Sequence, residues 1–522
     1  MSETHVLALD LGTGGPKAAV VSSSGRIDAS AFEPVGLQLL EGGGAEQDPD
    51  EWWKAASAAA RRALEHSGVA PEEIAGIGVT AQWSGTVAAG SDGRPLRPAI
   101  IWMDSRGAAA VRRQVRGRLN ALGYGVGHVA RWVRITGGAP GLSGKDPVAH
   151  ILWLRDNEPD VYEATHCFLE PVDWLNQRLT GRFAASHDSI ALHWVTDNRR
   201  PGRVRYDSKL LAMAGLDRAK LPDLLPTGTL VGELCGQAAS ELGLPEGVPV
   251  VTGTGDVHSA AVGSGAIADF DAHLYIGTSS WISCHVPFKR TDVLRNVASI
   301  PAGLPGRYLV ADEHETAGAC LELLRKVVLG RASDGSYPSY EELDRVAGSV
   351  EPGSGRVIFT PWLNGERSPV DDHTIRGGFH NLSLATSQEE LVRSVYEGVA
   401  YNSRWLLGAV ERFTRRRFDE LAFIGGGAKS DLWCQIHADV LGRRIRQVRD
   451  PVLANVRGAA MLTLLALGIV GTAELHGMVE VSALYEPDAA NARAYGELYA
   501  EMVNLYRKTK AIHRRLNGAS EG

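Results

Sequence analysis

The sequence predicts an α/β protein with two domains of similar design, and three observations support this. The chain has 522 residues, of which 44% are hydrophobic and 22% charged, so it can bury more than one core. Short apolar runs typical of strands alternate with longer segments whose apolar residues recur at helical spacing. The third observation is a strand-and-turn pattern that occurs twice, about half a chain apart.

The individual elements follow from local periodicity. The clearest strand candidates are the apolar runs Val6–Leu9, Ile77–Thr80, Val248–Thr252, His273–Ile276 and Leu421–Ile424. Other segments predict helices because their apolar residues recur at three- and four-residue steps. These helices are Trp52–His66, starting near Asp48-Pro49, Gln388–Val410, starting near Ser387, and Ala490–Leu516 at the carboxyl end.

The repeated pattern connects residues 9–15 with residues 275–280. Each copy is an apolar strand running into Gly-Thr and small residues: Leu9-Asp10-Leu11-Gly12-Thr13-Gly14-Gly15 and Tyr275-Ile276-Gly277-Thr278-Ser279-Ser280. Two such units suggest two domains that each offer a tight turn to a shared cleft. A Gly- and Ala-rich hinge near residues 256–268 would separate them. Chance similarity between two Gly-Thr turns is the alternative.

Composition narrows the class of partner to small molecules. The formal charge of −7 is modest, and Lys and Arg are dispersed, so neither a nucleic acid nor a membrane surface is expected as partner. The amino terminus lacks the basic region of a secretory signal, and the longest apolar run, Ala459–Gly471, is too short to span a bilayer. We therefore expect a cytoplasmic protein. The five cysteines form no C-x-x-C pair, so a disulfide framework or thiolate metal site is not expected.

Both Gly-Thr turns have the composition of phosphate-binding loops. Glycine lets the backbone approach a phosphate closely, and adjacent N–H groups with a Thr or Ser hydroxyl can bond its oxygens. Lys17 would add a positive charge facing the phosphates. The predicted phosphate-binding residues are Gly12, Thr13, Gly14 and Lys17 in the first turn and Gly277, Thr278 and Ser279 in the second.

Two common nucleotide-binding motifs fail on spacing. A Walker A loop needs glycine before Lys-Ser, but Ala428 takes that place in Gly425-Gly426-Gly427-Ala428-Lys429-Ser430. The dinucleotide fingerprint G-x-G-x-x-G also fails, because Gly253-Thr254-Gly255 lacks the third glycine. A nicotinamide-dependent dehydrogenase is therefore disfavoured.

Two acids accompany glycine turns in a way that suits phosphoryl transfer. Asp10 ends the first strand, and Asp256 closes Gly253-Thr254-Gly255-Asp256. Phosphoryl transfer needs a carboxylate near the Mg²⁺ that bridges nucleotide phosphates and another that deprotonates the attacking hydroxyl. We assign Asp10 to the metal and Asp256 to the catalytic base. The alternative for either acid is an Asp that satisfies the N–H groups of a turn.

Taken together, these residues resemble the FGGY family of carbohydrate kinases, with xylulokinase-like members nearest, from about Val6 to Gly468. Six motifs occur in the family's order. They are Asp10-Leu11-Gly12-Thr13 with Lys17, Thr80-Ala81-Gln82-Trp83-Ser84-Gly85 followed by Trp102-Met103-Asp104-Ser105-Arg106, Gly253-Thr254-Gly255-Asp256, Gly277-Thr278-Ser279, Gly365-Glu366-Arg367-Ser368-Pro369, and the adenosine-binding turn Gly425–Ser430.

The resemblance implies two actin-like, ribonuclease H-type ATPase domains around a central cleft, with ATP and Mg²⁺ as cofactors. Residues 1–262 would form the N-terminal domain, with the sugar side, the first phosphate turn and the base. Residues 263–522 would form the C-terminal domain, with the second phosphate turn, the adenosine site and the terminal helix. The adenosine site would include Gly426, Gly427 and Ser430.

The implied substrate is a small sugar or polyol, bound by Gln82, Trp83, Ser84, Trp102, Asp104 and Asp256. Tryptophan faces stack on sugars while polar groups bond hydroxyls. Glycerol kinases carry Arg-Glu and typical xylulokinases Met-His where this chain has Trp83-Ser84. A ketopentose such as xylulose leads the candidates, with ribulose, erythritol or a pentitol as alternatives. An actin-like nucleotide-binding module without a sugar substrate also stays open, as does a homodimer.

Overall fold

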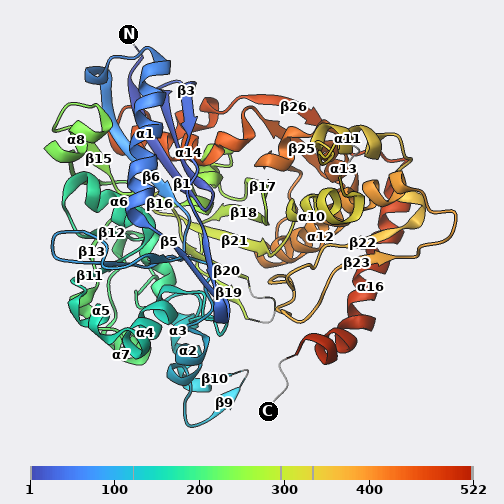
Figure 1. Cartoon of the computed structure of the whole chain (residues 1–522), viewed down its shortest axis with the longest axis horizontal. Coiled ribbons are helices and arrows are strands. Elements are labelled where there is room, and N and C mark those ends of the chain that lie inside the picture. The colour runs from blue at the N-terminus through green and yellow to red at the C-terminus, as the bar shows by residue number, and fades with distance from the viewer. Residues whose placement is uncertain (1–2, 122, 294, 296, 332–333, 519–522) are drawn as a thin grey trace.

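Two large mixed sheets, one from each half of the chain, form the framework of the molecule (Figure 1). The computed structural model describes residues 3–518 apart from 122, 294, 296, 332 and 333. In Figure 1 the first half, in blue and green, lies on the left, and most of the second half, in yellow to red, lies on the right. The predicted α/β class with two similar domains is confirmed.

The first large sheet has seven strands in the order β14-β15-β6-β1-β2-β3, with β16 paired to β6. Its strands are β1 His5–Gly12, β2 Gly15–Ser22, β3 Ile27–Phe32, β6 Ile74–Ala81, β14 Leu230–Glu233, β15 Pro249–Val251 and β16 Thr254–Gly255. Helix α1 (Pro49–Ser67) packs on one face. It begins where the sequence predicts, since the Asp48 side chain accepts a hydrogen bond from the N–H of Asp50.

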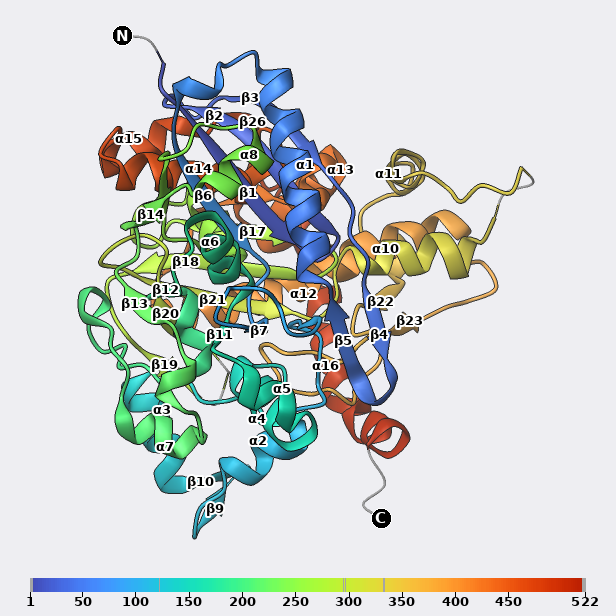
Figure 2. The ribbon, with the colours of Figure 1, turned by 60° about the vertical axis from the view of Figure 1, so that its left-hand side comes forward.

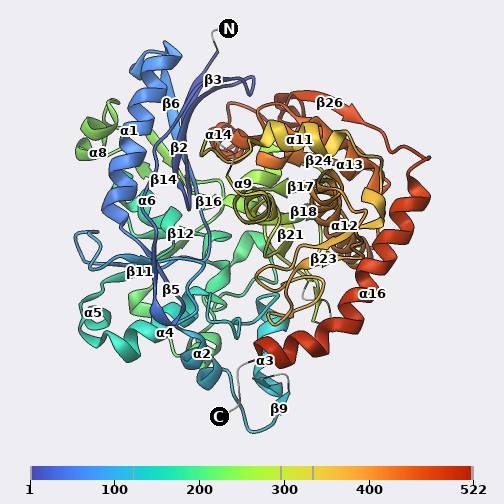
Figure 3. The ribbon, with the colours of Figure 1, turned by 45° about the vertical axis from the view of Figure 1, so that its right-hand side comes forward.

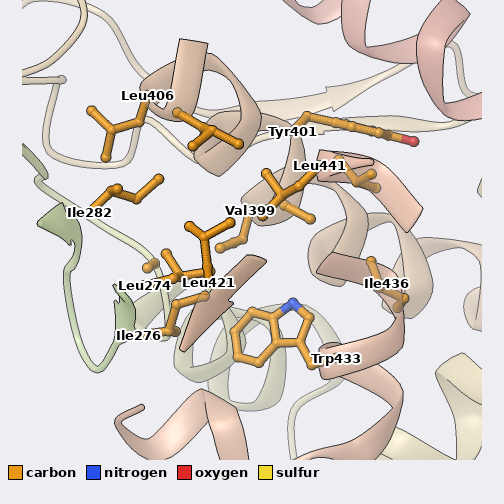
Figure 4. Packing of buried hydrophobic residues seen from close by; sticks show 14 of the residues in the cluster. Leu274, Ile276, Ile282, Val399, Tyr401, Leu406, Leu421, Trp433, Ile436 and Leu441 are labelled. Atoms are coloured by element: carbon orange, nitrogen blue, oxygen red, sulfur yellow. The ribbon is translucent and has the colours of Figure 1, made fainter. Parts of the chain in front are cut away.

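The second large sheet has eight strands in the order β19-β20-β21-β18-β17-β24-β25-β26. They are β17 Ala272–Ile276, β18 Ser280–Val286, β19 Thr291–Asp292, β20 Val297–Pro301, β21 Tyr308–His314, β24 Glu420–Ile424, β25 Arg444–Val448 and β26 Val481–Tyr485. Helices α12 (Gln388–Thr414) and α13 (Asp431–Leu441) cover one face, where side chains of both meet β17 and β24 (Figure 4). Helix α16 (Ala492–Asn517) runs along the outside of this half (Figure 1).

The two sheets repeat one pattern of strand directions. The order β14-β15-β6-β1-β2-β3 corresponds to β26-β25-β24-β17-β18-β21, and successive pairs are antiparallel, parallel, parallel, antiparallel and antiparallel in both. The two Gly-Thr turns join equivalent strands, β1 to β2 and β17 to β18. The pattern repeated in residues 9–15 and 275–280 therefore reflects a structural repeat, in which Tyr275 takes the place of Asp10.

Two helices lie between the sheets (Figure 3). Helix α9 (Asp256–Gly263) follows β16, and α14 (Ala454–Ala466) packs against it and against β1 and β6 of the first sheet. Much of the apolar run that begins at Ala459 is thus buried between layers. The segment predicted as a hinge is helical over residues 256–263, so the halves meet through packed helices instead of a loose linker.

Helices α9 and α14 cross backbone against backbone. A Cβ atom added at Gly263 would lie 1.8 Å from the carbonyl oxygen of Ala454. One added at Gly458 would lie 1.9 Å from the carbonyl oxygen of Ser259. Only glycine fits at these two positions, because a main-chain oxygen cannot move aside like the end of a side chain.

Replacing Gly458 by Ala is expected to destabilise the protein by about 1–3 kcal/mol, because the new methyl group forces the two helices apart. Thermal unfolding followed by circular dichroism measures this loss. Gly496→Ala in α16 is the matched control, since nothing lies within 4 Å of its added Cβ. Equal melting temperatures for the two variants would contradict the close crossing.

Shorter helices gather at one end of the first sheet (Figures 1 and 2). They are α2 Ala108–Gln114, α3 Val126–Ile135, α4 Pro147–Asn157, α5 Pro159–Ala164 and α7 Ser208–Ala214. The loop before α4 carries Lys145 to the second half of the molecule. Over residues 3–518, with the gaps given above, no helix is both long and apolar enough to span a bilayer.

Candidate active site

Strand alternation places Asp10 and Lys17 on one face of the first sheet. Leu7, Leu9 and Leu11 pack on the α1 side, whereas Val6 and Ala8 pack with α14. Asp10 continues the second series because side chains alternate along a strand. Asp10 pairs in register with Lys17 on β2, and Lys17 Nζ lies 3.4 Å from Asp10 Oδ2.

A cavity of about 170 Å³ brings the two halves of the chain together. It is lined by Asp10 and Lys17 from the first sheet and by Tyr275, Gly425, Gly426, Val452 and Asn455 from the second half. Asp10 Oδ1 is buried and makes no hydrogen bond to any described residue. A spare carboxylate oxygen suits Mg²⁺, while the lysine and the open backbone of Gly426 suit phosphate oxygens.

The turns of the second half also border this region. The N–H of Gly277 donates to the carbonyl of Ser279, and Thr278 is exposed. In the predicted adenosine turn, Gly426 is open, whereas Gly427 is buried, with its added Cβ 2.7 Å from Ile276. Ser430 caps α13 by accepting the N–H of Trp433 at 3.0 Å. The capping bond is a structural role that the resemblance alone did not reveal.

Thr13 links the predicted phosphate turn to the predicted sugar loop. Its Oγ1 donates to Gln82 Oε1 at 3.0 Å and accepts from Trp102 Nε1 at 3.0 Å. The amide of Gln82 in turn donates to Gln47 Oε1 at 2.7 Å. Gln82 is 3% exposed, so in this structure it holds Thr13 in place from the buried side. Trp102 is half-buried beside it.

Trp83 and Ser84 follow β6 and lie beside the turn that carries Asp256. The Trp83 ring stands edge-on to His258, with centroids 4.7 Å apart, and its Nε1 donates to the carbonyl of Ser189. Ser84 has a positive φ of 65° and donates its hydroxyl to the carbonyl of Lys145 at 2.8 Å. Both side chains are half-buried, so part of each remains open to solvent.

Asp104 differs from the other predicted sugar ligands. It is 1% exposed, and its carboxylate accepts from the N–H of Ala45 and from two nitrogens of Arg106, each at 2.9 Å. With these bonds it stabilises the turn that follows Trp102. The structure therefore gives Asp104 bonds to the surrounding framework.

Asp256 is the first residue of α9, and its surroundings perturb it strongly. Burial raises the pKa of Asp256 to about 7, and the carboxylates of Asp10 and Glu313 push it in the same direction. The N–H of Val257 and the charge of Lys17 oppose this rise in pKa. A carboxyl group with a pKa near neutrality is suited to general base catalysis.

Buried hydrogen bonds fix the turn before Asp256. Thr254 donates its hydroxyl to Asp188, which also accepts from Thr227. The Thr80 hydroxyl donates to the carbonyl of Thr254 at 3.0 Å. Gly253 admits no side chain, since its added Cβ would lie 2.2 Å from Val172. Asp256 is thus carried on a rigid turn.

A cluster of charged residues from both halves includes Glu313, whose carboxylate raises the pKa of Asp256. Arg367 bonds both Glu313 and Glu315, and Lys145 from the first half lies 3.7 Å from Glu315. The sequence analysis did not assign these four residues to the site. Glu313 and Glu315 are two apart at the end of β21, so strand alternation could have indicated that they share a face.

The same cluster explains the Gly365–Pro369 loop. Glu366 is fully buried and accepts from Asn402 at 2.7 Å and from the N–H groups of Glu315 and Arg367. Burial raises the pKa of Glu366 to about 8. Its hydrogen bonds hold the loop that places the Arg367 guanidinium between the two glutamates.

Comparison with known proteins agrees with this architecture. Residues 5–263 match the N-terminal domain of the FGGY family of carbohydrate kinases, and residues 273–467 match its C-terminal domain. A xylulose kinase of Staphylococcus epidermidis is 28% identical over 517 residues, covering 98% of both chains. One from Streptomyces rubiginosus is 30% identical over 468 residues, covering 89% of this chain and 88% of the other.

Solved structures show the same fold. The xylulose kinase from Rhodospirillum rubrum superposes with a TM-score of 0.82 at 26% identity, covering 98% of this chain and 100% of the other. The gluconate kinase from Lactobacillus acidophilus gives a TM-score of 0.86 at 22% identity, covering 99% and 100%. Matches over both halves, together with the paired Gly-Thr turns, show that this chain belongs to the FGGY family of carbohydrate kinases and phosphorylates a sugar at the expense of ATP.

Proposed function

We propose that this kinase phosphorylates a hydroxyl of a ketopentose, with xylulose as the first candidate and Asp256 as the general base. The observation that carries the proposal is the carboxyl group of Asp256, with a pKa raised to about 7 beside the cavity that Asp10 and Lys17 line. Ribulose, erythritol and the pentitols are the alternative substrates. The names of the relatives favour xylulose.

In the proposed reaction Asp256 accepts the proton of the attacking hydroxyl. Lys17 and the N–H groups of the two Gly-Thr turns stabilise charge on the nucleotide phosphates. Asp10 would hold Mg²⁺ through its free Oδ1, and the ion would neutralise phosphate charge. Trp83 and Ser84 would contact the sugar. The hydrogen bond between Gln82 and Thr13 would keep the first phosphate turn aligned with the sugar-binding loop.

The charges around Asp256 favour a neutral substrate over a sugar acid. The acids Asp10 and Glu313 act on Asp256, against the cation Lys17. The cluster around Glu313 adds Glu315 and Asp146, against Lys145 and Arg367. With Asp256 itself ionised, acids exceed bases. A carboxylate on the substrate would add repulsion at the position where phosphoryl transfer already concentrates negative charge.

An ADP-release assay with a substrate panel tests the proposal. The panel contains xylulose, ribulose, erythritol, pentitols, glycerol and gluconate. We expect the highest kcat/KM with a ketopentose and little rate with gluconate. Release of ADP that no sugar accelerates would instead favour the nucleotide-binding module, and preference for gluconate would contradict the charge argument.

The acid limb of the pH profile is expected to lie near pH 7. A base must be deprotonated, so kcat/KM should fall about tenfold per pH unit below pH 7 and level off above it. An unperturbed aspartate would place this limb near pH 4. Initial rates from pH 5 to 8.5 measure it, and a flat profile down to pH 5 would rule out the raised pKa.

A further inference from the structure

The structural repeat places Tyr275 where the first half has Asp10. Asp10 and Tyr275 each stand two residues before the Gly-Thr pair, and each is paired in register with a residue of the next strand, Lys17 or Trp281. Both Asp10 and Tyr275 line the same cavity. Tyr275, which carries a phenolic hydroxyl, therefore stands at the strand position that Asp10 takes in the first half.

The ring of Tyr275 is held firmly. It stacks on Trp281 with centroids 3.7 Å apart and an interplanar angle of 8°. The indole of Trp281 donates to His273 Nε2 at 3.0 Å, which fixes the stack in turn. The ring also fills the space above Gly425, whose added Cβ would lie 3.1 Å from Tyr275 Cδ2. Such packing leaves one orientation for the phenol.

The hydroxyl of Tyr275 lies over the second phosphate turn. A Cβ added at Gly277 would be 2.3 Å from the phenolic oxygen. Within the described part of the chain no residue hydrogen-bonds this oxygen, although the ring is largely enclosed. Burial and the carboxylates of Asp256 and Asp10 raise the pKa of Tyr275, so the group keeps its proton at neutral pH.

We propose that Tyr275 is a further catalytic residue, whose hydroxyl donates a hydrogen bond to a non-bridging phosphate oxygen of the bound nucleotide. It complements Lys17, which faces the same cavity from the other half. A neutral donor brings no counter-charge, and its rigid stack means that little ordering is needed when the nucleotide binds. The inference rests on the proposed nucleotide site but does not depend on which carboxylate is the base.

Tyr275→Phe tests this role, because phenylalanine keeps the stack on Trp281 and removes only the hydroxyl. We expect kcat to fall about 10- to 100-fold, as for loss of one hydrogen bond to a charged group. Calorimetry without sugar should show about tenfold weaker binding of the β,γ-imido analogue of ATP. Unchanged ADP binding would place the contact on the terminal phosphate, and a parallel loss would place it on the β-phosphate.

Tyr206→Phe is the matched control, since it removes a phenolic hydrogen bond to the carbonyl of Pro222 in the first half. Its turnover and nucleotide affinity should stay within about twofold of the unaltered enzyme, as expected for a change away from the site. Thermal unfolding of both variants checks that the compared samples contain the same fraction of folded protein. If Tyr275→Phe binds the imido analogue and turns over like the unaltered enzyme, the proposal is wrong, whatever the outcome for Asp256.

Discussion

The Asp256→Asn variant is expected to turn over sugar about 10²- to 10⁴-fold more slowly than the unaltered enzyme, the usual contribution of a positioned general base. Asparagine has nearly the same shape, so it can still accept the N–H of Val257 at the start of α9. It cannot take the proton of the attacking hydroxyl at neutral pH. The measurement is kcat at saturating ATP and sugar, from ADP release.

Retained nucleotide binding distinguishes loss of the base from loss of fold. Asp256→Asn should bind ADP with the affinity of the unaltered enzyme, and its melting temperature should not fall. The remaining activity of the variant should also no longer decrease as the pH falls below 7. Turnover within tenfold of the unaltered enzyme would remove Asp256 from the mechanism.

The second large effect is expected from Asp10→Asn. Removing the carboxylate should lower turnover about 10²- to 10³-fold at saturating Mg²⁺, because metal coordination contributes several kcal/mol to stabilising phosphate charge. The variant should also need a higher Mg²⁺ concentration for half-maximal rate. A magnesium titration of the rate measures both effects, and an unchanged Mg²⁺ dependence would exclude Asp10 from the metal site.

The pH profile of the same variant provides an independent readout. Asp10 raises the pKa of Asp256 by charge repulsion, so Asp10→Asn should move the acid limb to lower pH. Lys17 lowers the pKa of Asp256, so Lys17→Met is the matched variant of opposite sign and should move the limb to higher pH. Shifts in the same direction would mean that neither charge acts on the base.

Local patterns were enough to predict the framework of the molecule. Short apolar runs identified β1, β6, β15, β17 and β24, and capping residues located the starts of two long helices. The repeat of Gly-Thr turns also predicted two similar domains. These features depend on residues close in sequence, where period and turn chemistry act directly.

Contacts between distant segments could not be predicted from the sequence, for a physical reason. An apolar run such as 459–471 shows that a segment is buried but not what covers it, so the packing of α14 on the first sheet was not predictable. Residues 256–268 were predicted to form a hinge because Gly and Ala suit loops, but residues 256–263 form α9, since the same small residues also suit close helix crossings. Composition alone does not separate these uses.

The same limit applies inside the site. Asp104 has the chemistry of a sugar ligand, yet the guanidinium of Arg106 and the N–H of Ala45 occupy its oxygens. Glu313 and Glu315 lie close together in the sequence, but their partner is Arg367, more than fifty residues away. Residue type predicts what a side chain can bind, whereas the fold decides what reaches it.

Because α9 and α14 cross at their glycines, the angle between these helices affects the position of the Asp256 carboxylate. Asp256 stands at one end of α9, and Gly263, at the other end, touches α14. These positions are about 10 Å apart along the helix axis, so a tilt of about 10° at the crossing swings the carboxylate by about 2 Å. Since a misplacement of about 1 Å can slow a reaction roughly 10²-fold, the angle of this crossing sets how well the carboxylate is placed for chemistry.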